Sequence, residues 1–299
     1  MLGRILTAMI TPFDGHDRVD IDEAVRIARF LVERGNDGVV VAGTTGESPA
    51  LETEEKLALF RAVKAALPDA TVIAGTGGNN THHSVELTQQ AEACGVDGIL
   101  AVVPYYNKPT QDGMLLHFGA LAKATRLPIV VYNIPGRTGV NMLPATFAEL
   151  CRRHENIAGI KESTGDLNQF TTILRDRART DVRFWAGDDY IYLPSLAVGG
   201  WGVVSVAGHL VGPELRSMAE AYDRGDVATA SGIHRDLAPL IGALFATTSP
   251  IPVKWAMGQW GFRVGRCRSP LGAMPPALAE TLKPLIAAYA PSELAAARA

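Results

Sequence analysis

The chain has 299 residues, of which 47% are hydrophobic, 20% charged and 7% aromatic. This composition is typical of a folded globular protein and excludes disordered, collagen-like and low-complexity classes. The formal net charge is −3, and basic residues form no run longer than short arginine pairs, so nothing indicates binding to nucleic acid or an anionic membrane. No apolar stretch approaches the ~20 residues that a membrane span requires.

Cysteine usage indicates a reducing compartment. Cys94, Cys151 and Cys267 are far apart, odd in number and outside any CxxC or Cys/His metal spacing, which favours free thiols. Met1–Arg4 leads directly into strand-like sequence and has none of the regions of a signal peptide. We therefore expect a soluble, cytoplasmic protein.

Eight short apolar runs rich in β-branched residues recur along the chain. They are Arg4–Thr11, Gly38–Ala42, Thr71–Ala74, Gly98–Val103, Pro128–Tyr132, Ile157–Lys161, Arg183–Ala186 and Gly202–Val206. Their continuous hydrophobicity is typical of parallel strands that are buried on both faces. Amphipathic helix patterns lie between them, such as Ile21–Glu33, Glu54–Ala66, Ser84–Ala93 and Leu115–Ala124. The alternation predicts an α/β fold, a (β/α)₈ TIM barrel; a doubly wound sheet is the alternative, but it usually needs fewer strands and a glycine-rich nucleotide turn.

The strand runs stop near residue 225. Asp226–Phe245, Pro252–Trp260 and Pro275–Tyr289 follow with helical patterns. We predict a barrel over residues 1–225 and an all-α extension over 226–299, which packs on the barrel because no Pro/Ser-rich linker separates the two. The alanine-rich end, Ser292–Ala299, is expected to fray.

In a parallel barrel the active site lies at the carboxyl ends of the strands. Hydroxyl groups, one lysine and one arginine gather in the segments that end the strands and follow them, among them Gly43–Glu47, Pro104–Asn107, Tyr132–Thr138, Lys161–Ser163, Gly187–Asp189 and Val204–Val206. No His, Cys or carboxylate set there has the spacing of metal ligands, so we predict no metal.

Lys161 is the candidate nucleophile. Period-two geometry predicts that Ile157, Gly159 and Lys161 share one face of their strand. If that face lines the barrel interior, desolvation favours a neutral amine, which can condense with a ketone to an imine. The alternative is a solvated strand-end lysine, or one that pairs with Glu162.

Five other side chains have both a structural and a functional interpretation. Tyr132 is either a core aromatic or a proton donor and acceptor for an imine on the neighbouring strand. Thr44 and Thr45 are either turn residues or ligands of a carboxylate. Arg137 is either a surface residue or a bidentate clamp on a carboxylate, and Tyr106 either packs at the rim or anchors an interface.

The motifs in combination resemble those of a known family. Gly43–Glu47 (GTTGE), Pro104–Asn107 (PYYN), Tyr132–Gly139 (YNIPGRTG) and Gly159–Glu162 (GIKE) occur in this order, each at a predicted strand end. The set resembles the dihydrodipicolinate synthase family, within the N-acetylneuraminate lyase superfamily of class I aldolases. The resemblance continues through Ala186–Asp189, Gly202–Val206, Pro250–Lys254 and Arg268–Leu271.

The resemblance implies a lyase, 4-hydroxy-tetrahydrodipicolinate synthase, that condenses pyruvate with L-aspartate 4-semialdehyde in lysine and diaminopimelate biosynthesis. It implies that Lys161 forms the Schiff base with pyruvate and that Tyr132 is the acid and base. Thr44 would link Tyr132 to Tyr106, which reaches into the neighbouring subunit's site. It further implies a homotetramer of tight dimers and no cofactor.

Substrate-binding roles follow from the same resemblance. Thr45 would hold the pyruvate carboxylate and Arg137 the carboxylate of the semialdehyde. The main-chain groups of Gly187 and Val204 would line the pocket.

The chain also departs from the family pattern. Lysine-inhibited bacterial members have histidines and a glutamate at positions that correspond here to Thr53, Lys56 and His83. Lys56 adds a cation, and His83 replaces the anion that would bind the ammonium of lysine, so we predict weak or absent inhibition by lysine. Ser249 stands where asparagine is common, and the sequence suggests no mechanism for that change.

Two other functions compete with this interpretation. A pyruvate-dependent lyase of the same superfamily, acting on a sialic acid, a 2-keto-3-deoxy sugar acid or a 4-hydroxy-2-oxo acid, would share the imine chemistry. Arg137 favours a small carboxylated aldehyde, and Thr44-Thr45 differs from the Ser-Thr pair of sialic acid lyases. A non-catalytic, metabolite-binding barrel would usually have lost Lys161, Tyr132 or Arg137, and all three are present.

Overall fold

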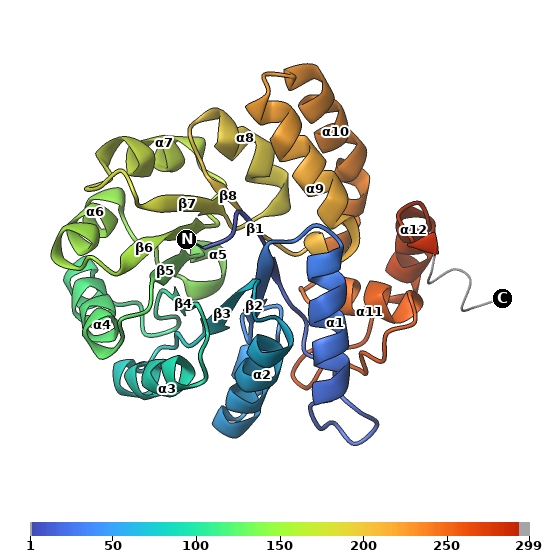
Figure 1. Cartoon of the computed structure of the whole chain (residues 1–299), viewed down its shortest axis with the longest axis horizontal. Coiled ribbons are helices and arrows are strands. Elements are labelled where there is room, and N and C mark those ends of the chain that lie inside the picture. The colour runs from blue at the N-terminus through green and yellow to red at the C-terminus, as the bar shows by residue number, and fades with distance from the viewer. Residues whose placement is uncertain (1, 293–299) are drawn as a thin grey trace.

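The computed structural model describes residues 2–292, and within them eight parallel strands close into a barrel surrounded by helices (Figure 1). Each strand pairs with its neighbours in chain order, and the last pairs with the first. The strands are β1 (Ile5–Ala8), β2 (Gly38–Val41), β3 (Thr71–Gly75), β4 (Gly98–Val102), β5 (Ile129–Asn133), β6 (Ile157–Glu162), β7 (Arg183–Ala186) and β8 (Gly202–Ser205). The predicted TIM barrel is confirmed.

The helices of the barrel alternate with its strands. They are α1 (Ile21–Glu33), α2 (Thr53–Ala66), α3 (Thr81–Ala93), α4 (Gln111–Ala124), α5 (Pro135–Thr138), α6 (Pro144–Arg153), α7 (Leu167–Asp176), α8 (Tyr192–Ala197) and α9 (Gly208–Asp223), with short 3₁₀ turns at η1 (Ser48–Ala50) and η2 (Asp189–Ile191). Their ends follow local chemistry: the Asp20 side chain, for example, accepts the Glu23 N–H at 3.0 Å and starts α1.

Alternation along each strand separates two apolar clusters. In β2, Val40 packs inside the barrel, whereas Val39 and Val41 pack outward against the helices. The Trp185 ring fills the interior next to Gly159, where a β-carbon would lie 2.6 Å from the ring. Glycine at 159 therefore leaves the room that the indole occupies.

The predicted common face of Ile157, Gly159 and Lys161 is wrong for Ile157. The pairing of β5 with β6 shifts by one residue: Ile129 is opposite Ile157, but Val130 is opposite Gly159. This bulge turns Ile157 into the outer cluster, while the residues after it keep their alternation. A strict period of two cannot reveal such an insertion.

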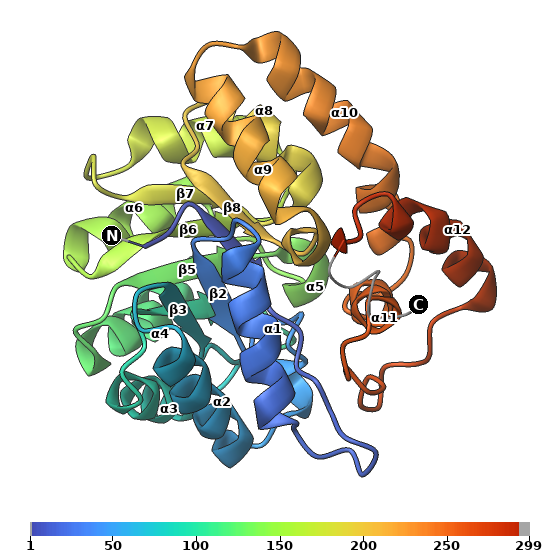
Figure 2. The same cartoon turned by 45° about the vertical axis from the view of Figure 1, so that its right-hand side comes forward.

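Three helices follow the barrel: α10 (Val227–Leu244), α11 (Ile251–Gln259) and α12 (Pro276–Ala287), as predicted to within two residues. They contact one another, and α10 and α11 also contact α9, so the extension covers one side of the barrel (Figure 2). The division into two domains at residue 226 stays a prediction. The predicted fraying of Ser292–Ala299 concerns mainly residues 293–299, which lie outside the described residues. No helix within residues 2–292 is long and apolar enough to cross a bilayer.

A buried ion pair joins the extension to the loop after β2. Lys254 of α11 contacts the Glu47 carboxylate with Nζ and Oε1 2.7 Å apart, and both side chains are at most 2% exposed. The second carboxylate oxygen accepts the Arg268 N–H at 2.7 Å, and Lys254 also donates to the Arg266 carbonyl at 3.0 Å. Burial lowers the pKa of Lys254, and the Glu47 carboxylate opposes that effect.

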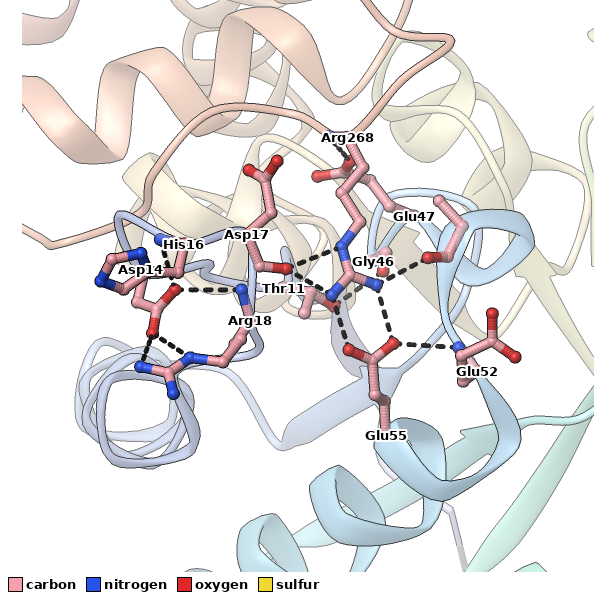
Figure 3. A network of polar contacts seen from close by, with 11 residues as sticks. Thr11, Asp14, His16, Asp17, Arg18, Gly46, Glu47, Glu52, Glu55 and Arg268 are labelled. Atoms are coloured by element: carbon pink, nitrogen blue, oxygen red, sulfur yellow. Dashed lines mark hydrogen bonds and ion pairs between the residues drawn. The ribbon is translucent and has the colours of Figure 1, made fainter.

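Arg268 extends this connection to the surface of the barrel (Figure 3). Its guanidinium binds both carboxylate oxygens of Glu55, at 2.7 and 2.6 Å, and donates to the carbonyls of Ala50 and Asp17. The Arg268 side chain thus holds three segments together: the loop after β1, the loop after β2 and the start of α2.

We predict that Lys254→Ala lowers the free energy of unfolding by about 3–5 kcal/mol, because it leaves the Glu47 carboxylate buried without its cation. Urea unfolding measures this loss. Lys123→Ala, on an exposed helix face, is the matched control, and its free energy of unfolding should lie within about 0.5 kcal/mol of the wild-type value. The double variant Lys254→Met/Glu47→Gln should recover part of the loss. A Lys254→Ala protein as stable as the control would contradict this account.

Candidate active site

The Lys161 side chain lies in the barrel interior and is 5% exposed. In the strand register it is flanked by Tyr132 of β5 and Trp185 of β7, both of which belong to the interior cluster. Its Nζ lies 4.1 Å from the centroid of the Tyr132 ring. The proposed nucleophile and the proposed acid and base are therefore in contact, and the solvated alternative for the lysine is wrong.

Glu162 is not the partner of Lys161. Alternation turns its side chain outward, where one carboxylate oxygen accepts Asn133 Nδ2 at 2.9 Å and Gln169 Nε2 at 3.2 Å, and the other accepts the Thr164 N–H at 2.8 Å. Burial raises the pKa of Glu162 despite these hydrogen bonds. The carboxylate of Glu162 thus forms hydrogen bonds on the outer side of the barrel and does not pair with Lys161.

A cavity of about 440 Å³ opens at the carboxyl ends of β2–β5. Thr44, Tyr106, Tyr132 and Arg137 line it, and their predicted roles stay predictions. Lys161 and Thr45 are not among its lining residues: Lys161 lies against the inner side of the Tyr132 ring, and Thr45 is buried. The far end of the cavity is lined by Lys56 of α2 and His83 of α3.

The loop that carries Thr44 and Thr45 is held on several sides. The Thr11 hydroxyl donates to the Gly46 carbonyl at 2.7 Å, and Glu47 is tied to the C-terminal segment as described above. Within the described residues Thr44 makes no hydrogen bond to Tyr132 or Tyr106. The proton relay through Thr44, which needs the Tyr106 of a neighbouring subunit, therefore stays a prediction.

Tyr106 is unusual in both backbone and exposure. Its φ of +72° lies in the left-handed region, which a bulky side chain rarely adopts, and the residue is 88% exposed. The backbone N–H donates to the Thr138 carbonyl at 3.4 Å, on the segment that follows β5. A strained, exposed tyrosine at the rim of a cavity is poorly explained by packing within one chain.

Arg137 lies on the exposed surface of the short helix α5, at the mouth of the cavity. Its Nη2 is 3.5 Å from the Ser249 carbonyl, a long contact that leaves the guanidinium able to bind another acceptor. The C-terminal extension thus borders the mouth. Nothing in the single sequence indicated this position for Ser249.

Gly187 lies close to Lys161, whereas Val204 is known only to belong to the interior cluster, so the pocket-lining roles of their main-chain groups stay predictions. A β-carbon at Gly187 would be 3.1 Å from Lys161 Cε and 1.9 Å from Ser163 Oγ, so only glycine leaves both side chains in place. The Gly187 N–H already donates to the Glu162 carbonyl at 2.8 Å. Val204 of β8 packs in the interior cluster with Tyr132. Ser163, two residues after the lysine, has no role assigned from sequence.

Metal ligands do not gather here. Within residues 2–292 no group of three or more His, Cys, Asp and Glu side chains is arranged to hold a metal ion. The chemistry available in the described site is that of an amine, phenols, hydroxyls and a guanidinium.

Solved structures of known proteins share this architecture. A dihydrodipicolinate synthase from Cyanidioschyzon merolae, solved with lysine bound, is 43% identical, covers 96% of this chain and 98% of its own, and superposes with a TM-score of 0.94. The chloride-inhibited dihydrodipicolinate synthase of Acinetobacter baumannii, solved in complex with pyruvate, is 32% identical, covers 97% of this chain and 100% of its own, and has a TM-score of 0.92.

Sequence comparison agrees with the structures. A 4-hydroxy-tetrahydrodipicolinate synthase from Moorella thermoacetica is 53% identical over 270 residues, which are 90% of this chain and 92% of the relative. One from Parasynechococcus marenigrum is 50% identical over 288 residues, 96% of this chain and 95% of the relative. Residues 1–288 match the Dihydrodipicolinate synthetase family, and the chain therefore belongs to that family.

Proposed function

We propose that this enzyme is a 4-hydroxy-tetrahydrodipicolinate synthase, a lyase that condenses pyruvate with L-aspartate 4-semialdehyde. The observation that carries the proposal is the Lys161 amine, buried in the barrel with its Nζ 4.1 Å from the Tyr132 ring centroid. Family membership and relatives of this name at about half identity support the choice among pyruvate-dependent aldolases.

The first half of the reaction forms an enamine. The neutral Lys161 amine attacks the ketone carbon of pyruvate, and the resulting carbinolamine loses water to give the imine. The Tyr132 phenol donates the proton that the departing hydroxide needs. The Tyr132 phenolate left by that step then takes a proton from the methyl carbon, which converts the imine into the enamine with the nitrogen as electron sink. Thr45, in the buried loop, holds the pyruvate carboxylate.

The second half joins the two substrates. The enamine carbon attacks the aldehyde carbon, the carbonyl electron pair moves to oxygen and is protonated, and the imine re-forms. The amino group of the second substrate then attacks the imine carbon, closes the ring and releases the Lys161 amine. Arg137, exposed at the cavity mouth, binds the carboxylate of the semialdehyde. The Gly187 N–H is not free to bind substrate, because it donates to the Glu162 carbonyl. Gly187 contributes instead by having no side chain, which leaves room for the Lys161 side chain.

The proposal includes a homotetramer built from dimers in which Tyr106 enters the partner's site. Its 88% exposure and its left-handed backbone support a role across an interface, where the phenol would reach Thr44 of the other subunit. Leu116 of α4, which is 77% exposed, gives the same region an apolar surface to cover.

A cytoplasmic location belongs to the same proposal. Cys94, Cys151 and Cys267 are free thiols in the structure. Burial raises the pKa of Cys151 to about 12 and that of Cys267 to about 11, so both thiols stay protonated and unreactive at neutral pH.

The decisive experiment for the reaction is reductive trapping. Incubation with pyruvate and borohydride should add one reduced pyruvate to Lys161, read by peptide mass spectrometry. Lys161→Ala should lose the adduct and at least about 10⁴-fold in kcat, since it removes the amine that forms the imine beside Tyr132. Lys123→Ala, at an exposed lysine, should behave as wild type. An adduct on another residue, or faster cleavage of sugar acids than condensation with the semialdehyde, would refute the proposal.

The dimer contribution can be tested by mixing inactive subunits. Tyr106→Ala and Lys161→Ala should each be nearly inactive as pure proteins. After unfolding and refolding together in equal amounts they should regain about a quarter of wild-type activity, because half of randomly formed dimers contain one intact site. The pure variants, treated in the same way, are the controls. No gain on mixing, with dimers shown by sedimentation, would exclude a Tyr106 supplied by the partner.

We also propose weak or absent feedback inhibition by lysine. Lys56 lines the cavity and is half-buried, and Thr53 begins the same helix. Lys56 places an amine where the ammonium of a lysine ligand would need an acceptor, and a charged Lys56 repels that ammonium. Burial lowers the pKa of Lys56, and the carboxylates of Glu52 and Glu55 oppose that effect. Activity should be unchanged by millimolar lysine, whereas Thr53→His/Lys56→His/His83→Glu should gain inhibition. Inhibition of the wild type below millimolar concentrations would show this to be wrong.

A further inference from the structure

The Ser163 hydroxyl is a buried polar group without a protein partner. Its Oγ is shielded from solvent and makes no hydrogen bond to any residue within 2–292. Buried hydroxyls in folded proteins are normally hydrogen-bonded, and an exception calls for an explanation such as a ligand. Other serines in this chain follow the rule: the Ser195 hydroxyl, also buried, donates to the Tyr192 carbonyl at 2.7 Å.

The position of Ser163 is set by the barrel itself. It follows the last residue of β6, and its backbone N–H donates to the Asn133 carbonyl of β5 at 2.9 Å. The Gly187 N–H, just after β7, donates to the carbonyl of Glu162, the residue before Ser163. The hydroxyl is therefore carried by hydrogen-bonded strand ends, which place it more firmly than a mobile loop would.

The Ser163 hydroxyl and the Lys161 side chain pack around the same glycine. A β-carbon at Gly187 would lie 1.9 Å from Ser163 Oγ and 3.1 Å from Lys161 Cε, so both side chains occupy the region that a side chain at 187 would need. Glu162, between them in sequence, points to the outer wall. Lys161 is thus bordered by the Tyr132 ring, whose centroid is 4.1 Å from Nζ, and by Gly187, against which the Ser163 hydroxyl packs.

We propose that Ser163 binds the second substrate by donating a hydrogen bond to its aldehyde oxygen. The inference rests on the proposed function. Ser163 lies two residues beyond Lys161 toward the carboxyl end of the barrel, the side from which the aldehyde reaches the enamine. Negative charge develops on the aldehyde oxygen as the carbon–carbon bond forms, and a fixed donor at that oxygen lowers the barrier. Ser163 itself transfers no proton in this step.

The test separates this step from imine formation. Ser163→Ala should lower kcat/KM for L-aspartate 4-semialdehyde about 10- to 100-fold, the size of one hydrogen bond to a charged group. It should leave kcat/KM for pyruvate and the yield of the borohydride adduct within twofold of wild type. Its thermal midpoint should equal or exceed that of wild type, because no protein hydrogen bond is lost. Ser163→Thr keeps a hydroxyl and should stay within about threefold of wild type for the semialdehyde.

Ser195→Ala is the matched control, since it removes a buried hydroxyl that has a protein partner. It should lower the thermal midpoint and leave both kinetic constants unchanged. Unchanged use of the semialdehyde by Ser163→Ala, equal losses for both substrates, or a Ser163→Thr variant as impaired as Ser163→Ala would overturn the inference alone. A wild-type enzyme that traps pyruvate but does not condense it with the semialdehyde would overturn the proposed function, and this inference with it.

Discussion

The contact between the Lys161 amine and the Tyr132 ring is the interaction on which the rest of this site depends. A lysine inside a barrel is costly when charged, and a carboxylate beside it would fix that charge. The structure keeps the adjacent acid, Glu162, on the opposite face and gives the amine an aromatic neighbour and a phenol. The closed barrel enforces this arrangement, because neighbouring strands hold the two side chains in register.

Space around the lysine is as important as its neighbours. Gly159 leaves room for the Trp185 ring, and Gly187 leaves room for the Lys161 and Ser163 side chains. Both strands are hydrogen-bonded to their neighbours, so their backbones cannot move aside to make the same room. A reacting group within a packed core therefore requires residues that contribute no side chain at two points of the wall.

The helical extension is part of the site as well as a cover on the barrel. Lys254 and Arg268 hold Glu47, and Glu47 ends the loop that carries Thr44 and Thr45. At the cavity mouth the Ser249 carbonyl contacts Arg137. Two groups that we propose to bind the substrates are thus positioned by residues more than 100 positions away in the chain.

Sequence periodicity was sufficient to predict the barrel, because continuous hydrophobic runs and helical patterns are local and can be recognised without knowledge of tertiary contacts. The motifs also placed Lys161 and Tyr132 near the carboxyl ends of their strands, and Thr44 and Arg137 in the segments that follow β2 and β5. Tertiary structure alone decided three matters. A one-residue bulge turned Ile157 outward, an ion pair formed across 207 residues between Glu47 and Lys254, and the Ser163 hydroxyl came to lie beside Lys161 at Gly187. Each depends on which strands and loops meet in space, and a pattern confined to one segment carries no information about its distant neighbours.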